Sequence, residues 1–254
     1  MWPSLLAISL APGAAIMLYI YWRDRQDREP IKLLFVCFLL GIVSALLAIL
    51  IDKGLEPIQT EMTEPGTIPD KLFTAFIMAA FVEELCKFSM CRIYAYPKKA
   101  FNEPLDGIVY MVMVAMGFAT IENVMYVFSN PETGMQVGLL RMFLAVPGHA
   151  CWGVIVGYFM GLAKFKPRNK FLYMVIGLIC GMLLHGTYDG ALFLRESNEL
   201  RGGEYEGALI GGALFTAVLG YVLAFLAIRK HRKISRALFP KDPNTPVAAG
   251  QLEI

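Results

Sequence analysis

The sequence predicts an all-α integral membrane protein, a bundle of about seven transmembrane helices. Three observations predict this fold. Of the 254 residues, 57% are hydrophobic and only 17% are charged, whereas a soluble domain carries about a quarter charged residues. The apolar residues form runs of the ~20 residues that a helix needs to cross a ~30 Å hydrocarbon core. The basic residues are concentrated in alternate loops between these runs, as in polytopic membrane proteins.

Seven segments qualify as membrane-spanning helices. In chain order they cover residues 3–22, 31–51, 71–93, 105–128, 138–163, 170–194 and 206–228. The first lacks the basic start of a cleavable signal peptide, so it is interpreted as a retained span. Residues 1–236 are therefore expected to form one transmembrane domain. The proline-rich and polar stretch 237–254 is expected to be a disordered cytoplasmic tail.

The distribution of lysine and arginine predicts the orientation of the bundle. The loops 23–30, 92–104 and 164–170 are rich in basic residues, as is the stretch after the last span, whereas 52–70 and 129–137 are poor in them. Basic loops face the cytoplasm under the positive-inside rule. The N-terminus is therefore expected outside and the C-terminus inside. In a membrane protein of this kind, a net charge of +2 gives no indication of nucleic-acid binding.

Ionisable residues lie inside several of these spans, although each charged side chain at membrane depth costs ~2.5–3.5 kcal/mol even on a permissive scale. Counting from the outer end of each span at 1.5 Å per residue places Glu83, Glu122, His149 and His185 roughly 10–18 Å below the outer surface. Polar residues with unrelated structural roles have no reason to share a layer. Because intramembrane ionisable groups are functional by default, the sequence predicts one site in the outer half of the bilayer.

The spacing of the charged residues suggests roles for them. In FVEELCK, Glu83 and Lys87 are i,i+4 with the acid first, the favourable order for a helical ion pair, and Lys87 is also i+3 from Glu84. Paired with lysine, one glutamate stays ionised, and the other is placed to take a proton from water. His185 and Asp189 are also i,i+4, so the aspartate can orient one ring nitrogen and leave the other free for a metal or an oxyanion.

Four polar residues in the spans also have a structural interpretation that competes with a functional one. Asn123 is favoured as a hydrogen-bonding link between helices. Lys87 is as good a charge balancer as a catalyst, and Asp189 can reach the outer interface. Arg141 lies near the outer end of the fifth span and receives less weight for the same reason.

The fifth span combines a helix breaker with small residues. Pro147 is expected to open or kink the helix beside His149. Glycines along the same span are expected to form a close-packing face against another helix. They are Gly148, Gly153, Gly157 and Gly161.

Six features of the sequence resemble, in the same order, the PrsW family of intramembrane proteases. They are RDRQDREP at 23–30, EExxK at 83–87, DGIVY at 106–110, FxxxEN at 118–123, His149, and HxxxD at 185–189. The resemblance covers roughly residues 10–230. It implies a membrane-embedded peptidase that makes the outward-side first cut in a membrane-anchored anti-sigma factor during envelope stress. The implied substrate is a single-span protein, and the implied location is the lipid bilayer of a bacterial cytoplasmic membrane.

Two mechanisms are compatible with the candidate residues. The predicted catalytic residues are Glu83, Glu84, Lys87, Asn123 and Asp189, and the predicted metal ligands, or alternatively oxyanion- or water-positioning residues, are Glu122, His149 and His185. With a metal, both histidines and a glutamate (Glu122 or Glu84) hold Zn²⁺ and another glutamate is the base. Without a metal, Glu83 or Glu84 activates water, and the histidines and Asn123 stabilise the oxyanion. HExxH is absent, so the spacing does not demand zinc.

Other functions stay open as alternatives. The wider superfamily includes CAAX prenyl endopeptidases, bacteriocin-processing or immunity proteins and the non-catalytic scaffold subunit of gamma-secretase, so the fold does not define the substrate. A proton-coupled transporter also uses buried acids and histidines. Inverted repeats and polar groups in both leaflets are expected of such a carrier, and this sequence shows neither. A scaffold that keeps the polar residues only for structure is the third alternative.

Overall fold

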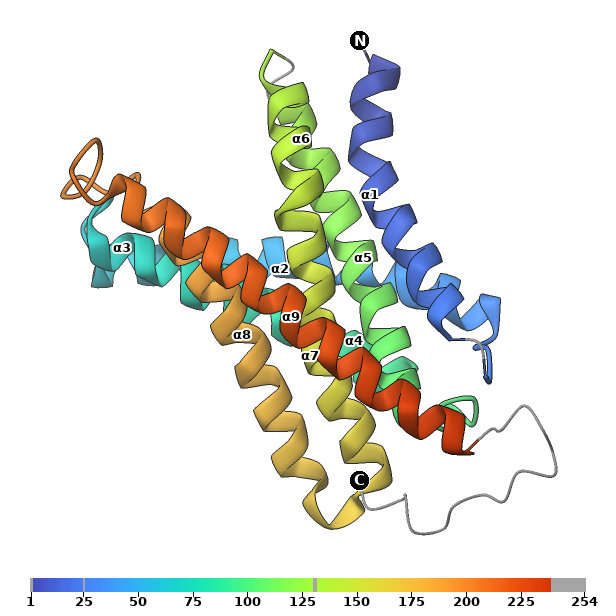
Figure 1. Cartoon of the computed structure of the whole chain (residues 1–254). Helices are drawn as coiled ribbons and strands as arrows, with labels where there is room; N and C mark the ends of the chain where they lie inside the picture. The colour runs from blue at the N-terminus through green and yellow to red at the C-terminus, as the bar shows by residue number, and fades with distance from the viewer. Residues whose placement is uncertain (1, 25, 130–131, 239–254) are drawn as a thin grey trace.

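The computed structural model describes residues 2–24, 26–129 and 132–238, and this part of the chain is a helical bundle without strands (Figure 1). The long helices are α1 (Trp2–Arg23), α2 (Ile31–Met62), α5 (Pro104–Ser129), α7 (Ala145–Phe165), α8 (Lys170–Leu194) and α9 (Glu206–Leu238). The shorter segments are α3 (Ile68–Phe73), the π-helical η1 (Thr74–Val82), α4 (Glu83–Tyr94), α6 (Gly134–Phe143) and the 3₁₀ turn η2 (Pro167–Asn169).

The helices follow the predicted spans. In the described residues, 6 helical stretches are long and apolar enough to cross a membrane. The remaining predicted span, 71–93, is the continuous run of α3, η1 and α4, in which charged residues interrupt the apolar sequence. Its π-helical part ends directly before Glu83, and π-helical turns are rare and frequent at functional sites. Residues 237 and 238 of the predicted tail belong to α9, and 239–254 lie outside the described residues.

Contacts between loops define the two ends of the bundle. At one end, Ser235 near the end of α9 donates to Glu103 in the loop before α5 (3.0 Å). At the other end, the N–H of Asn198 donates to the carbonyl of Gly66 (2.7 Å), which joins the α8–α9 loop to the α2–α3 loop. This grouping of loops agrees with the predicted alternation of the spans. Which end faces the cytoplasm stays a prediction.

Helix α5 is the centre of the bundle, buried along most of its length and packed against α1, α2 and α7. Figure 1 shows α5 and α7 side by side, with α9 crossing in front of them. Glycines allow this close packing: Gly107 on α5 faces Gly157 on α7, and Gly117 on α5 faces Gly41 on α2. A Cβ atom at any of these four positions would collide with the backbone of the facing helix.

The glycines of the fifth predicted span divide into two groups. Gly153, Gly157 and Gly161 pack against α5, as the spacing predicts. A Cβ at Gly148 would instead meet the ring of Trp152 on its own helix. The close-packing face therefore begins one turn after the position expected from the sequence.

The fifth predicted span is also divided in two, because the helix is interrupted at Leu144, three residues before Pro147. Proline has no N–H, so the carbonyl oxygen of Phe143 lacks its usual partner four residues on. This oxygen accepts a hydrogen bond from the hydroxyl of Tyr221 on α9. The interruption that Pro147 was expected to cause therefore ties α9 to the start of the helix that carries His149.

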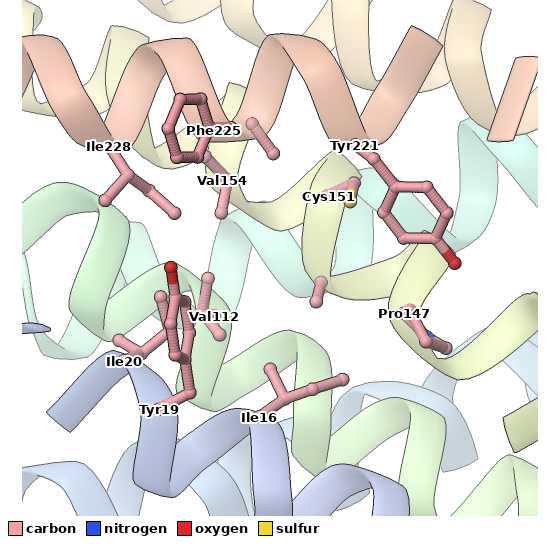
Figure 2. Close-up of a pocket in the computed structure, with 12 residues that line it drawn as sticks. Ile16, Tyr19, Ile20, Val112, Pro147, Cys151, Val154, Tyr221, Phe225 and Ile228 are labelled. Atoms are coloured by element: carbon pink, nitrogen blue, oxygen red, sulfur yellow. The ribbon is translucent and has the colours of Figure 1, made fainter. Parts of the chain in front are cut away.

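An apolar cavity of about 240 Å³ lies between α1, α5, α7 and α9 (Figure 2). Side chains such as Ile20, Val154 and Phe225 line it, and the tyrosines Tyr19 and Tyr221 border it. None of the predicted site residues lines this cavity. The charged groups inside the bundle meet elsewhere, beside α7 and α8.

Candidate active site

Charged and histidine side chains from four helices converge in one cluster. They are Glu83, Glu84 and Lys87 from α4, Glu122 from α5, His149 from α7, and His185 and Asp189 from α8. Glu84, Lys87 and both histidines are buried, whereas Glu83, Glu122 and Asp189 are 12%, 16% and 17% exposed. The structure thus brings together the four residues that were expected to share one layer. The side of the cluster where these three partly exposed carboxylates lie is here called its open side.

The ammonium group of Lys87 lies at the centre of the cluster. Its Nζ is 2.6 Å from Glu84 Oε1, 3.0 Å from His149 Nδ1 and 3.6 Å from Glu83 Oε2. The ring of Phe118 lies against it, with the ring centroid at 4.3 Å. The short ion pair is therefore Glu84–Lys87, and the Glu83–Lys87 pair that the i,i+4 spacing favours is the longer one. The reason is that Glu84 and Lys87 both point inward from α4, toward α8 and α7.

The two adjacent glutamates have different surroundings, because consecutive side chains on a helix point about 100° apart. Glu84 is 1% exposed, and its Oε1 accepts from Lys87 and contacts His185 Nδ1. Its Oε2 has no hydrogen-bond partner and lies toward Gly181 of α8. The Oε2 of Glu83 also has no hydrogen-bond partner, but Glu83 lies at the open side of the cluster. This oxygen is itself buried, 3.6 Å from Lys87 Nζ and 4.0 Å from His185 Nε2, although the Glu83 side chain as a whole is partly exposed. Of the two glutamates, Glu83 is therefore the one that combines an unbonded oxygen beside the histidines with a partly exposed side chain.

Both ring nitrogens of His185 face carboxylates. Nε2 is 3.0 Å from Asp189 Oδ2, and Nδ1 is 3.0 Å from Glu84 Oε1. Asp189 orients the ring as the spacing predicts. The expectation that the second nitrogen stays free is wrong, because Glu84 approaches it from α4. The ring of Trp152 stacks on His185 with centroids 3.8 Å apart and planes within 14°, so the imidazole is held on three sides.

The contacts of His149 define which nitrogen carries its hydrogen. Nδ1 is 3.0 Å from the ammonium of Lys87, and Nε2 is 2.9 Å from Glu122 Oε2. An ammonium group can only donate, so Nδ1 accepts. Nε2 then carries the hydrogen and donates it to Glu122, an assignment made from the hydrogen-bond network. The ring of His149 is therefore held between a cation and a carboxylate.

Arg141 belongs to the same network, although its sequence position near a span end gave it little weight. Its Nη2 is 2.5 Å from Glu122 Oε2, and its Nε donates to Asn123 Oδ1 (3.0 Å). The signal in the sequence was an arginine inside an apolar run on the same span as His149. Snorkelling to the interface was the competing interpretation. The structure shows that the guanidinium instead reaches Glu122.

Asn123 is buried but points away from the cluster. Its Nδ2 donates to the carbonyl of Ser9 on α1 (3.1 Å), and its Oδ1 accepts from Arg141. The amide therefore links α1, α5 and α6, which is the interhelical role favoured for it by the sequence. Its N–H groups are directed to α1, and not to the site of an oxyanion beside the histidines.

Glu83, His149 and His185 together offer a set of metal ligands. One ligand atom from each lies within 4.8 Å of the others. Two histidines and one carboxylate form a ligand set of catalytic zinc sites, and the unbonded Oε2 of Glu83 suits such a role. The carboxylate ligand in this set is Glu83, whereas the expectation from the sequence was Glu122 or Glu84. A bound metal would have to displace one neighbour of each histidine, since both ring nitrogens of His149 and of His185 are engaged.

Comparisons with known proteins identify the family of the chain. A family described as "PrsW family intramembrane metalloprotease" matches residues 29–202, a segment that contains every residue of the cluster. Proteins named Protease PrsW from Geobacillus kaustophilus and Bacillus subtilis are 33% and 34% identical over 193 and 187 residues, which is 76% and 73% of this chain and 81% of each relative. A Protease PrsW from Clostridioides difficile is 32% identical over 195 residues, 75% of this chain and 79% of that protein. No solved structure matches the chain.

The resemblance noted from six features in the sequence therefore extends across most of the chain and of its relatives. The helices that carry these features meet around two histidines and three glutamates. In the part of the chain that the structure describes, 6 helices are long and apolar enough to cross a membrane. The chain belongs to the PrsW family of intramembrane proteases and is a multi-pass membrane protein that hydrolyses peptide bonds.

Proposed function

We propose that this protein makes the outward-side cut in a single-span membrane protein, such as a membrane-anchored anti-sigma factor. Two considerations support the proposal. The loop charges predict that the cluster lies in the outer half of the bilayer, and its open side carries Glu83, Glu122 and Asp189. A peptide bond near the outer end of a substrate helix lies at this depth. The observation that carries the proposal is the unbonded Oε2 of Glu83 beside two buried histidines.

In the proposed reaction, Glu83 is the residue that handles the proton of water. Peptide hydrolysis adds a hydroxyl to the carbonyl carbon and a hydrogen to the leaving nitrogen as the C–N bond breaks. Oε2 of Glu83 accepts the proton of the attacking water and later gives it to the leaving amine. Glu84 is less suited to this step because it is buried and its Oε1 is held by Lys87 and His185.

The two histidines position the reacting groups. Asp189 and Glu84 hold the ring of His185, and Glu122 and Lys87 hold the ring of His149. Their ring planes are 81° apart, with centroids at 5.2 Å. Rings that are fixed in this way need little reorganisation when charge develops on the substrate, and such preorganisation lowers the barrier.

The family description implies a metal ion, and Glu83, His149 and His185 would hold it. When bound, the ion would supply a Lewis acid for the water and the peptide carbonyl. Metal analysis of the purified wild type and of the Glu83→Gln variant separates the two roles of Glu83. A variant that keeps the metal and loses activity identifies Glu83 as the base, whereas loss of the metal identifies it as a ligand.

The test of function uses a single-span reporter tagged at both ends and co-expressed with the protein. Glu83→Gln and His185→Gln, at wild-type expression, are expected to leave the reporter uncut, since removing a general base costs typically 10²–10⁴-fold in rate. Glu103→Gln is a matched control, because Glu103 is a buried glutamate at the other end of the bundle. The peptidase assignment of these residues fails if both variants cut the reporter at the wild-type rate.

The outward direction of the cut has its own test. Met135→Cys places a thiol at a partly exposed position of α6, at the end of the bundle predicted to be outside. An impermeant thiol reagent is expected to label this variant in intact cells, with the wild type as the control for its own cysteines. Labelling only after permeabilisation would put the cluster in the inner half of the membrane and exclude an outward-side cut.

A further inference from the structure

We propose that Arg141 is a positioning residue for His149, acting through the carboxylate of Glu122. The inference rests on the proposed role of the cluster and adds to it a residue that lies outside the sequence motifs. Arg141 is on α6, on the opposite side of the interruption at Leu144 from His149 on α7. The two residues are connected through α5, because both contact its residue Glu122.

The contacts of Arg141 hold its guanidinium in one place. Nη2 donates to Glu122 Oε2 at 2.5 Å, and Nε donates to Asn123 Oδ1 at 3.0 Å. The guanidinium carbon lies 4.1 Å from the ring centroid of Tyr126. Asn123 is in turn anchored on the carbonyl of Ser9. Three side chains of α5 thus contact Arg141: two by hydrogen bonds and one by its ring. One of the three, Asn123, is also bonded to α1.

The oxygen that Arg141 binds is the one that His149 uses. Glu122 Oε2 lies 2.5 Å from Arg141 Nη2 and 2.9 Å from His149 Nε2. Since Lys87 occupies Nδ1, the hydrogen of His149 is on Nε2 and points to this oxygen. A shift of the Glu122 carboxylate would release the ring from one of its two supports. Arg141 therefore controls the orientation of His149 without touching it.

The electrostatics favour the same conclusion. Glu122 is largely buried, and an unpaired carboxylate in an apolar environment is costly. Glu122 Oε2 meets the N–H of His149 and the guanidinium of Arg141. Of these two donors, Arg141 is the one that carries a full positive charge. Arginine suits this place better than lysine, because its planar fork can donate to Glu122 and Asn123 at the same time.

The kinetic test compares Arg141→Gln and Arg141→Lys with the wild type on a purified single-span reporter. Loss of a residue that orients a ligand or catalytic histidine typically costs 10–100-fold. We therefore expect kcat of Arg141→Gln to fall by about that factor with KM unchanged. Arg141→Lys should recover part of the loss, since it restores the charge but not both hydrogen bonds. Arg195→Gln is the control, because it removes another Arg–Glu pair (2.8 Å) in a loop away from the cluster.

A second readout does not depend on activity. The chain has only 3 histidines, so ¹⁵N-histidine NMR spectra of the full protein in micelles can be assigned with His185→Gln and His231→Gln. The Nε2–H resonance of His149 should be hydrogen-bonded and protected from exchange in the wild type and in Arg195→Gln. In Arg141→Gln it should shift and exchange faster.

The two readouts separate the possible failures. An unchanged Nε2–H resonance and unchanged kcat in folded Arg141→Gln would overturn the positioning role, even if the wild type cuts the reporter. A fall in thermal stability alone, with both readouts at their wild-type values, would also overturn it. If the wild type cuts no reporter but the resonance still responds to Arg141→Gln, the positioning role stands and the proposed function fails.

Discussion

Two groups of buried carboxylates lie toward opposite ends of α5, and the protein stabilises them differently. In the active-site cluster, Glu84 is bonded to Lys87 and Glu122 to Arg141. The other group, here called the loop-end cluster, consists of Asp24, Glu29, Glu103 and Asp106. Within the described residues, none of these four acids forms a salt bridge. Salt bridges are therefore what distinguishes the two clusters.

The loop-end acids accept hydrogen bonds from neutral donors. The hydroxyl of Tyr110 donates to Glu29, and that of Ser235 donates to Glu103. The backbone N–H of Glu29 donates to Asp24, and the N–H of Glu103 donates to Asp106. These bonds join the α1–α2 loop, the start of α5 and the end of α9. The loop-end cluster is thus a structural link between segments that are distant in the chain.

Burial without a salt bridge raises the pKa values of the loop-end acids. Burial raises the pKa of Asp24 to about 6 and that of Glu29 to about 7. Burial also raises the pKa of Glu103 to about 8, and the neighbouring acids Asp24 and Glu29 add to the effect. In the cluster of the candidate active site, by contrast, Lys87 and Arg141 each form a salt bridge with a carboxylate. Without a salt bridge, the pKa of the buried acid is raised, and its hydrogen bonds join segments of the fold.

The largest effect on stability is expected from breaking the central ion pair. Lys87→Met would leave Glu84 buried without its cation, which typically costs 3–5 kcal/mol. Unfolding of the purified protein in mixed micelles measures the change. The double variant Lys87→Met/Glu84→Gln should recover much of the loss, because it removes the unpaired charge. A loss below about 1 kcal/mol in the single variant would remove the distinction between the two clusters.

The contribution of the loop-end cluster to stability should instead depend on pH. Because the pKa of Glu103 rises from 4.5 to about 8 on folding, the folded state binds more protons than the unfolded state between these values. Its contribution to stability is therefore greatest below about pH 4.5 and is lost as the pH rises through about 8. Glu29 and Asp24 act in the same direction over narrower ranges.

Thermal unfolding of the wild type and Glu103→Gln between pH 5 and pH 9 tests this. Glutamine stays neutral, so the difference in Tm, variant minus wild type, should increase with pH. Glu64→Gln is a suitable control, because Glu64 is exposed. A difference in Tm that is constant across the range would show that Glu103 is not protonated in the folded protein.

The smallest effect is expected from a single neutral donor. Ser235→Ala removes the hydroxyl that donates to Glu103, and a neutral buried hydrogen bond is worth about 1 kcal/mol. The same unfolding measurement in micelles checks it, and cleavage of the reporter should stay at the wild-type rate. A loss of activity without a loss of stability would indicate that the loop-end cluster is coupled to the active site.

Much of the candidate site was predictable because its signals are local. Hydrophobic runs and loop charges located Glu83, Glu122, His149 and His185 at a common depth, and helical spacing paired His185 with Asp189. The same spacing could not say whether Lys87 binds Glu83 or Glu84, since both lie within one turn of it. It also could not show that the second nitrogen of His185 meets Glu84, because that contact joins α8 to α4.

The sequence by itself determined the helical class, the positions of the spans and the family, because these follow from run length, charge distribution and motif order along the chain. The tertiary structure alone decided which partners each polar group meets. The π-helical η1 precedes Glu83, and the interruption at Leu144 separates Arg141 from His149. Both features help define how side chains of different helices face one another. Contacts between different helices depend on how each helix is rotated about its axis. The spacing of residues within one helix does not reveal that rotation.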